Sequence, residues 1–84
     1  MNIYHISQKE NTGYDTYDSA IVVAKSARDA RSINPDMSYD GKPNWGKIRF
    51  SSWCNSPKQV KAKLIGKALG TMKLGVVCSS FNAG

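Results

Sequence analysis

The chain has 84 residues, of which 40% are hydrophobic and 21% are charged. This composition is ordinary for a folded domain and excludes the disordered class, whose members carry more charge and fewer apolar residues. The length predicts a single domain over residues 1–84, near the lower limit for a chain that folds on one core without disulfides or metal. The longest apolar run, Ala20 to Ala24, is far too short to cross a membrane.

The formal net charge of +6 is unevenly distributed along the chain. Residues 1–45 carry five basic residues and all six acidic ones, whereas residues 46–84 carry seven basic residues and no acid. This asymmetry points to an anionic partner or surface.

The N-terminus shows neither the basic segment nor the apolar segment of a secretion signal, so we expect a cytoplasmic protein. In the cytoplasm we expect the two cysteines of the chain, Cys54 and Cys78, to be reduced. Cys78 is expected to be a small buried residue of a strand. With His5, which we expect to be a half-buried strand residue, the chain offers three N or S ligands, fewer than a closed zinc site needs. We expect no metal and no cofactor.

Two β-prone runs open the chain. Residues 2–7 alternate, which places Ile3 and His5 on one face of a strand. Residues 19–25 are rich in Ile and Val and predict a second strand, joined to the first through a polar loop as an antiparallel hairpin.

A short helix is predicted next. Ser26 and Asp29 have the spacing of a capping box, in which the serine hydroxyl accepts a hydrogen bond from the amide of residue 29. The helix should extend from Ala27 to about Ile33, because Asn34 precedes a proline and is pushed out of helical space.

The second half of the chain predicts more strands. Residues 47–52 and 75–81 are strand candidates, and Val60 to Leu64 alternates with Lys61 and Lys63 on the solvated side. Together the elements predict an α+β fold: a small, mostly antiparallel sheet of about four strands with one helix packed on one face. One helix covers only part of such a sheet, which leaves a face for a second copy or for another partner.

Two Tyr-Asp pairs precede the second strand: Tyr14-Asp15 and Tyr17-Asp18. One interpretation is a turn in which both aspartates accept bonds from backbone amides two residues on. The other is an exposed patch for a protein partner, since tyrosine flanked by small polar residues is suited to interfaces. The pattern does not match a Ca²⁺ loop of the EF-hand type, which spaces its acids more densely and closes with a glutamate that is absent here.

Basic and aromatic residues gather in the second half of the chain. On strands, two pairs of cations would share one face, where charge and stacking could hold single-stranded nucleic acid. The alternative is an ordinary solvated face, since no RNP motif, KH loop or helix-turn-helix spacing is present. The candidate residues are Lys47, Arg49, Lys61, Lys63, Trp45 and Trp53.

Signatures of enzymes are absent from the sequence, including GxSxG, a phosphate loop, GxGxxG and HExxH. The glycines are scattered singly, as in turns. We therefore expect a protein that is not an enzyme and has no catalytic residues.

Three blocks of sequence resemble a group of small bacteriophage and prophage proteins of unknown function: "IYHISQ", "GYDTYDSAIVVA" followed by "SARDAR" and "INP", and "GVVCSSFNAG". The resemblance covers both ends and much of the middle, and no counterpart is found for residues 36–47. It implies a phage origin and expression in a bacterial cytoplasm, but it brings no functional residues.

Small phage proteins mostly act by binding, which implies a protein that modulates or inhibits a host complex such as a polymerase or a CRISPR effector. The residues expected to contact that partner are Tyr14, Asp15, Tyr17 and Asp18. The alternative is a nucleic-acid-binding accessory protein that uses the basic sheet face.

Overall fold

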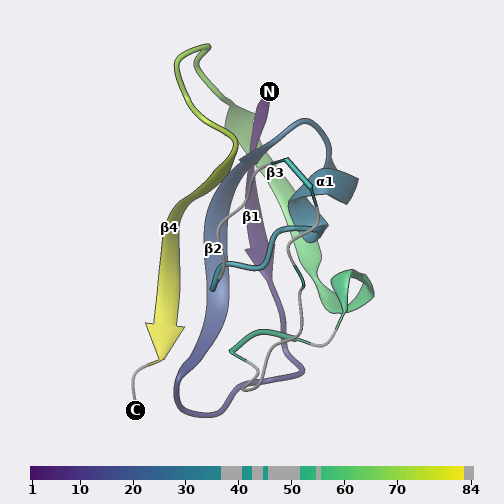
Figure 1. The fold of residues 1–84 in the computed structure, drawn as a ribbon, viewed down its shortest axis with the longest axis vertical. Coiled ribbons are helices and arrows are strands. Elements are labelled where there is room, and N and C mark those ends of the chain that lie inside the picture. Colours follow the sequence, from purple (N-terminus) through teal and green to yellow (C-terminus); the bar gives the residue numbers. More distant parts are fainter. Residues whose placement is uncertain (37–40, 43–44, 46–51, 55, 83–84) are drawn as a thin grey trace.

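The computed structural model describes the chain except for residues 37–40, 43–44, 46–51, 55 and 83–84. Four strands form one antiparallel sheet in the order β3-β1-β2-β4, and a short helix, α1, contacts β1, β2 and β3 (Figure 1). The predicted small α+β fold, an antiparallel sheet with one helix, is confirmed. The elements are β1 (Asn2–Ser7), β2 (Thr16–Ala24), α1 (Ala27–Arg31), the 3-10 turn η1 (Pro57–Gln59), β3 (Lys61–Lys67) and β4 (Gly75–Asn82).

The two central strands, β1 and β2, form the predicted antiparallel hairpin. Tyr4 lies opposite Val22 and Ile6 opposite Ala20, and all four side chains are buried beneath α1. Alternation along β1 therefore turns His5 to the other side of the sheet, which we call the far face. His5 is half-buried there, as predicted.

The start of β2 lies at Thr16, three residues before the predicted strand. The Thr16 hydroxyl donates to the Gly13 carbonyl at 2.6 Å, and the Tyr17 amide donates to the Ser52 carbonyl at 2.7 Å. These bonds hold the backbone extended ahead of the apolar run, so β2 begins before its hydrophobic pattern does.

Gln8 organises the polar loop between β1 and β2. Its side-chain oxygen accepts from the amides of Glu10 and Asn11 at 2.9 and 2.8 Å. Its amide nitrogen donates to the carbonyls of Asn11 and Tyr17 at 2.6 and 3.0 Å. A buried side-chain amide has four hydrogen bonds to satisfy, and here all four are made.

The N-cap of α1 is the predicted one. The Ser26 hydroxyl accepts from the Asp29 amide at 3.2 Å. The helix ends at Arg31, before the predicted end at Ile33, because the Ile33 amide bonds to the Ala30 carbonyl in a 3-10 turn. That tighter turn carries Ile33 into the core, where it is fully buried.

The hydrophobic core lies between the α1 side of the sheet and a layer formed by α1 and the segments around Ile33 and Trp53. Both Ile33 and Trp53 have no exposed surface. The buried members of the core are Tyr4, Ile6, Ala20, Val22, Ala24, Ala30, Ile33, Trp53, Cys54 and Val60.

β3 follows the predicted alternation only at its start. A β-bulge shifts the register, so that Leu64 lies opposite Tyr4 and Gly66 opposite Ile3, with Ile65 as the extra residue. Leu64 was expected on the buried side but is 58% exposed, because an edge strand has no neighbour to cover its outer side. The strand predicted at 47–52 lies outside the described residues except for Ser52, which forms a bend.

β4 is the other edge strand, and its exposure overturns one expectation. Cys78 was expected to be buried, but it is exposed, because only β2 pairs with β4. The strand begins at Gly75, whose φ of 116° lies in a region that side chains with a Cβ rarely adopt.

Replacing this glycine should be costly. Gly75→Ala is expected to lower the free energy of unfolding by about 1–3 kcal/mol, because alanine is strained at that φ. Urea unfolding followed by circular dichroism measures the change. Gly70→Ala is the matched control: an added Cβ meets open space there, and we expect a change within about 0.5 kcal/mol. Equal losses in the two variants would contradict the assignment of strain to Gly75.

Candidate binding surfaces

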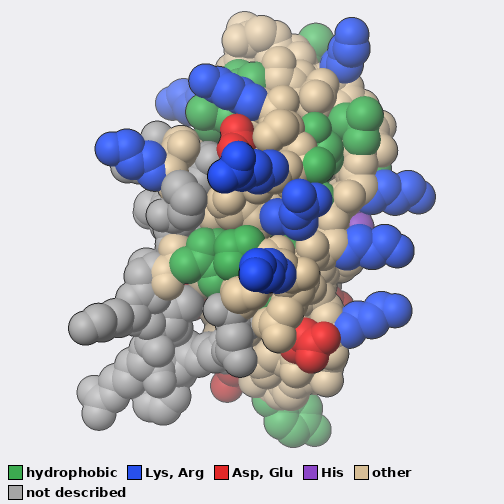
Figure 2. Space-filling view, turned by 90° about the vertical axis from the view of Figure 1, so that its right-hand side faces the viewer, with side chains coloured by type: hydrophobic (Ala, Val, Ile, Leu, Met, Phe, Trp, Pro, Cys, Tyr) green, Lys and Arg blue, Asp and Glu red, His purple; other side chains and the backbone are tan. Residues whose placement is uncertain are grey.

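Four lysines, which we call the lysine edge, line the β3 side of the sheet: Lys58 in η1, and Lys61, Lys63 and Lys67 in β3. All four are exposed. The distance from Lys61 to Lys67 along the extended strand is about 20 Å. Figure 2 shows Lys and Arg side chains gathered over this side of the molecule.

The bulge in β3 decides where these charges point. Lys61 and Lys63 lie opposite Ser7 and His5, so they project from the far face. Beyond the bulge, Lys67 lies opposite Asn2 and projects from the α1 side. The lysine edge therefore presents cations from both faces of one strand.

The charge that the lysine edge can offer to a partner depends on whether its lysines form ion pairs. None of the four lysines forms an ion pair in the part of the chain that the structure describes. Lys61 lines a hollow of about 250 Å³ that Lys9 and Glu10 also line, without an ion pair between these side chains. Unpaired cations in a row produce a positive potential that attracts anions.

The aromatic residues predicted to accompany the cations lie elsewhere. Trp53 is fully buried, so its ring cannot stack on a base. Trp45 packs against the core, and its indole N–H donates to the Ser32 carbonyl at 2.9 Å. The prediction that these two rings stack on bases is therefore corrected, because Trp53 is buried in the core and Trp45 packs against it. Lys47 and Arg49 lie outside the described residues.

The loop before β2 presents an exposed tyrosine and two acids, which we call the Tyr14 turn: Tyr14, Asp15 and Asp18. Tyr14 is 78% exposed, and Asp15 has a φ of 59°, in the left-handed region that aspartate tolerates better than most residues. Within the described residues, neither aspartate makes the predicted bond to an amide two residues on. The Thr16 hydroxyl closes the turn instead.

Tyr17 does not belong to this exposed group. Its ring packs against the core and stacks on Phe81, with ring centroids 4.7 Å apart and planes inclined by 25°. Burial raises the pKa of the Tyr17 hydroxyl, and the neighbouring Asp36 carboxylate raises this pKa further by repulsion and by accepting its hydrogen bond. Tyr17 therefore holds the segment after α1 against β2 and β4.

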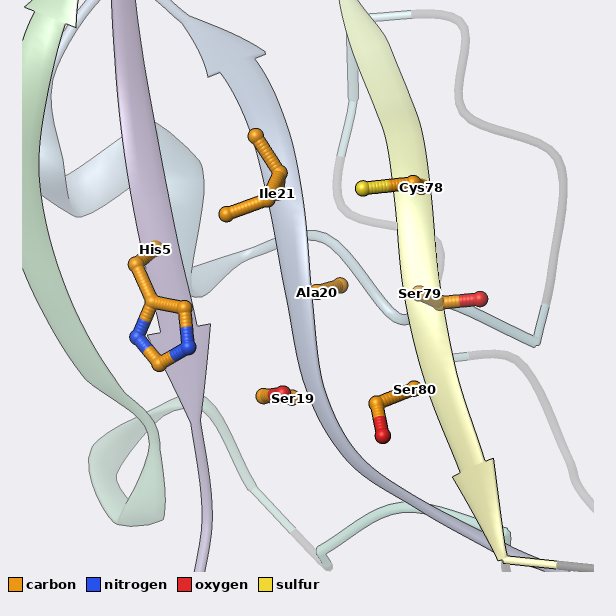
Figure 3. Close-up of a pocket in the computed structure, with 7 residues that line it drawn as sticks. All are labelled: His5, Ser19, Ala20, Ile21, Cys78, Ser79 and Ser80. Carbon is orange, nitrogen blue, oxygen red and sulfur yellow. The ribbon is translucent and has the colours of Figure 1, made fainter.

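The far face has a shallow hollow of about 160 Å³ (Figure 3). Its lining includes a histidine and a cysteine, two residue types that can take part in catalysis. His5, Ile21 and Cys78 form one row across the sheet, with Ile21 in the middle. Two interstrand spacings, about 9–10 Å, separate the backbones of His5 and Cys78, too far for a hydrogen-bonded nucleophile and base. The row therefore does not form a Cys–His pair.

The two cysteines are free and differ in environment. Cys54 is buried, which raises the pKa of its thiol, and its S–H group donates to the Ser56 carbonyl with an S···O distance of 3.5 Å. Burial and a raised pKa both disfavour the reactive thiolate. Cys54 is thus a core residue, and Cys78 is the accessible thiol of the two.

No helix in the described part of the chain is long and apolar enough to span a membrane. Over the same residues, no group of three or more His, Cys, Asp or Glu side chains is placed to hold a metal ion.

Comparison with known proteins gives no relative: no family model, no curated protein and no solved structure matches this chain. The resemblance to small phage proteins therefore stays a prediction.

The raised pKa of Tyr17 gives a prediction about pH. Because folding favours the neutral phenol, the stability that it contributes is present below the ordinary tyrosine pKa of about 10 and is lost as the pH rises through the folded value. Tyr17→Phe is expected to lose less stability than the wild type between neutral pH and about pH 11.

Urea unfolding at a series of pH values measures this difference. The control is Tyr14→Phe, which removes an exposed hydroxyl and should follow the wild-type curve. An alkaline loss of stability that is unchanged in Tyr17→Phe would contradict the role given to Tyr17.

Proposed function

We propose that the protein is a non-enzymatic binding protein whose lysine edge contacts nucleic acid. The observation that carries this proposal is the line of exposed lysines in η1 and β3, which form no ion pair with any described residue and lie in a half of the chain that has no acid. Lysine is a flexible point charge, which suits contact with a chain of phosphates.

The geometry favours a partner that is recognised by charge. Lys61 and Lys63 lie two residues apart, about 7 Å along the strand, and project on the same side. The rings of Trp45 and Trp53 are engaged in the core, so phosphate contacts carry the binding. Such binding is insensitive to base sequence and falls steeply with salt.

The salt dependence tests this proposal. If all four lysines contact phosphates of a single strand, log Kd should change with log salt concentration with a slope of about 3. Lys61→Gln with Lys63→Gln removes two contacts, and the slope should fall by about 1.4. Fluorescence anisotropy of a labelled single-stranded oligonucleotide, measured between about 50 and 200 mM salt, gives both slopes.

The control is Lys25→Gln with Lys73→Gln, which removes the same charge from exposed positions outside the lysine edge. The proposal predicts a smaller change in slope for this control. Equal effects of the two double variants, or a wild type that does not bind at the lowest salt, would exclude the lysine edge as a nucleic-acid surface.

A second candidate function is binding to a host protein complex through the Tyr14 turn. The observation that favours it is the 78% exposure of Tyr14, a large aromatic side chain that two exposed acids, Asp15 and Asp18, follow in the sequence. Exposed tyrosine is common at the energetic centres of interfaces. The partner surface would be basic, to complement Asp15 and Asp18. This is the inhibitory role implied by the resemblance to phage proteins.

Affinity capture from a nuclease-treated bacterial lysate tests the second candidate. The wild type should capture a defined protein partner. The double variant Tyr14→Ser, Asp18→Ser should bind this partner at least tenfold more weakly, since a central interface residue contributes about 2 kcal/mol or more. The Lys61→Gln, Lys63→Gln variant serves as control and should retain the partner. Capture that the Tyr14 variant leaves unchanged would remove the Tyr14 turn from the interface.

A further inference from the structure

β4 has one paired side and one unpaired side. The strand stands at the margin of the sheet, with β2 on its inner side (Figure 1). Residues 76–81 are all exposed. On the outer side, the backbone N–H and C=O groups make no hydrogen bond with any described residue. Such an edge is a template for pairing with another strand.

The two edges of the sheet differ in chemistry. β3 carries three lysines, a common device that prevents pairing between sheet edges. β4, with the sequence GVVCSSFN, has neither a charge nor a proline. It also exposes apolar side chains: Val76 is 37% exposed, Val77 52% and Phe81 48%. The lysines that protect β3 are therefore missing from β4. The pairing of β4 with β2 has register shifts near Val77 and between Tyr17 and Ser19, and the residues of β4 between these shifts, 78–80, keep a regular register.

We propose that β4 pairs antiparallel with β4 of a second copy, which joins two sheets into one of eight strands. Identical strands pair in this way around a two-fold axis, the commonest symmetry of soluble oligomers. Main-chain hydrogen bonds supply the affinity, as in other cases of strand addition.

The neutrality of β4 is the argument for a second copy as the occupant, because a strand without charge matches another neutral strand better than a charged one. Each chain has a net charge of +6, so two copies approach best through a surface without cations. β4 is such a surface, and three interstrand spacings, about 14 Å, separate it from β3. That distance exceeds the Debye length of about 8 Å at physiological salt, so repulsion between the β3 lysines of the two copies is largely screened. An acidic partner, by contrast, finds no opposite charge on β4.

The middle of β4 defines the register of the pair. With the two-fold axis at Ser79, Cys78 of each copy lies opposite Ser80 of the other, and the two Ser79 residues face each other. The exposed side chains at the centre are then small, which lets the backbones approach. The two Cys78 side chains share a face at a diagonal distance of about 7–8 Å, within reach of a short bismaleimide.

Sedimentation velocity of the full chain, without nucleic acid, tests the proposal. The wild type is expected at twice the 9.2 kDa of one chain when the concentration is high. Ser79→Lys and Ser79→Glu each place like charges opposite each other, and each should raise the dimer dissociation constant at least tenfold. Because the charges are complementary, an equimolar mixture of the two variants should restore the dimer. Leu64→Lys places a new charge on exposed β3 and is the control that should leave the dimer intact.

Cross-linking provides an independent reading. A short bismaleimide should link wild-type chains into a covalent dimer, and Cys54→Ser should behave alike because Cys54 is buried. Cys78→Ser should abolish the product. A wild type that stays monomeric, a mixture that fails to dimerise, or a control that dissociates as Ser79→Lys does would overturn the pairing of β4 with itself. The result is independent of the lysine edge, since no oligonucleotide is present.

Discussion

The pairing of β1 with β2 is the interaction on which the rest of the structure depends. These strands occupy the centre of the sheet, and each supports one edge strand, β3 beside β1 and β4 beside β2. The same pairing aligns Tyr4 with Val22 and Ile6 with Ala20, which forms the floor of the core. A slip of one residue would turn this floor to the far face. This one register therefore determines where the lysine edge, the Tyr14 turn and the exposed β4 edge lie.

The two edges of the sheet carry the features on which the proposed lysine-edge contact and the proposed β4 pairing rest, and their difference arises from a few residues. On β3 the bulge at Ile65 reverses the alternation, so the lysines appear on both faces. On β4 the absence of charge leaves the backbone accessible. A strand with cations attracts an anionic chain, whereas an edge strand without charged side chains can pair with another strand. The two surfaces lie on opposite margins, so occupation of one does not block the other.

Local patterns in the sequence were sufficient for the fold class, the β1–β2 hairpin and the cap at Ser26. They were insufficient where the answer depends on strand order. Cys78 and Leu64 sit in apolar patterns, yet both are exposed because their strands lie at the edges. Burial of Trp53 likewise depends on how distant segments meet, which its neighbours in sequence do not encode. For the lysine edge, the acid-free half of the chain was the available signal, and it did not single out Lys58 or Lys67.

The register between β2 and β4 also bears on how the chain folds. Thr16 lies opposite Asn82 and Val23 opposite Gly75, so the pairing of these two strands closes a loop that holds more than half of the chain. The β1–β2 hairpin, in contrast, is local. Closing a long loop costs conformational entropy before any contact rewards it, and domains rich in such contacts fold in milliseconds to seconds. We infer that β4 joins the sheet late, after the hairpin has formed. During that interval the backbone edge of β2 that receives β4 has unpaired N–H and C=O groups, and at this stage the small domain is most exposed to misassembly.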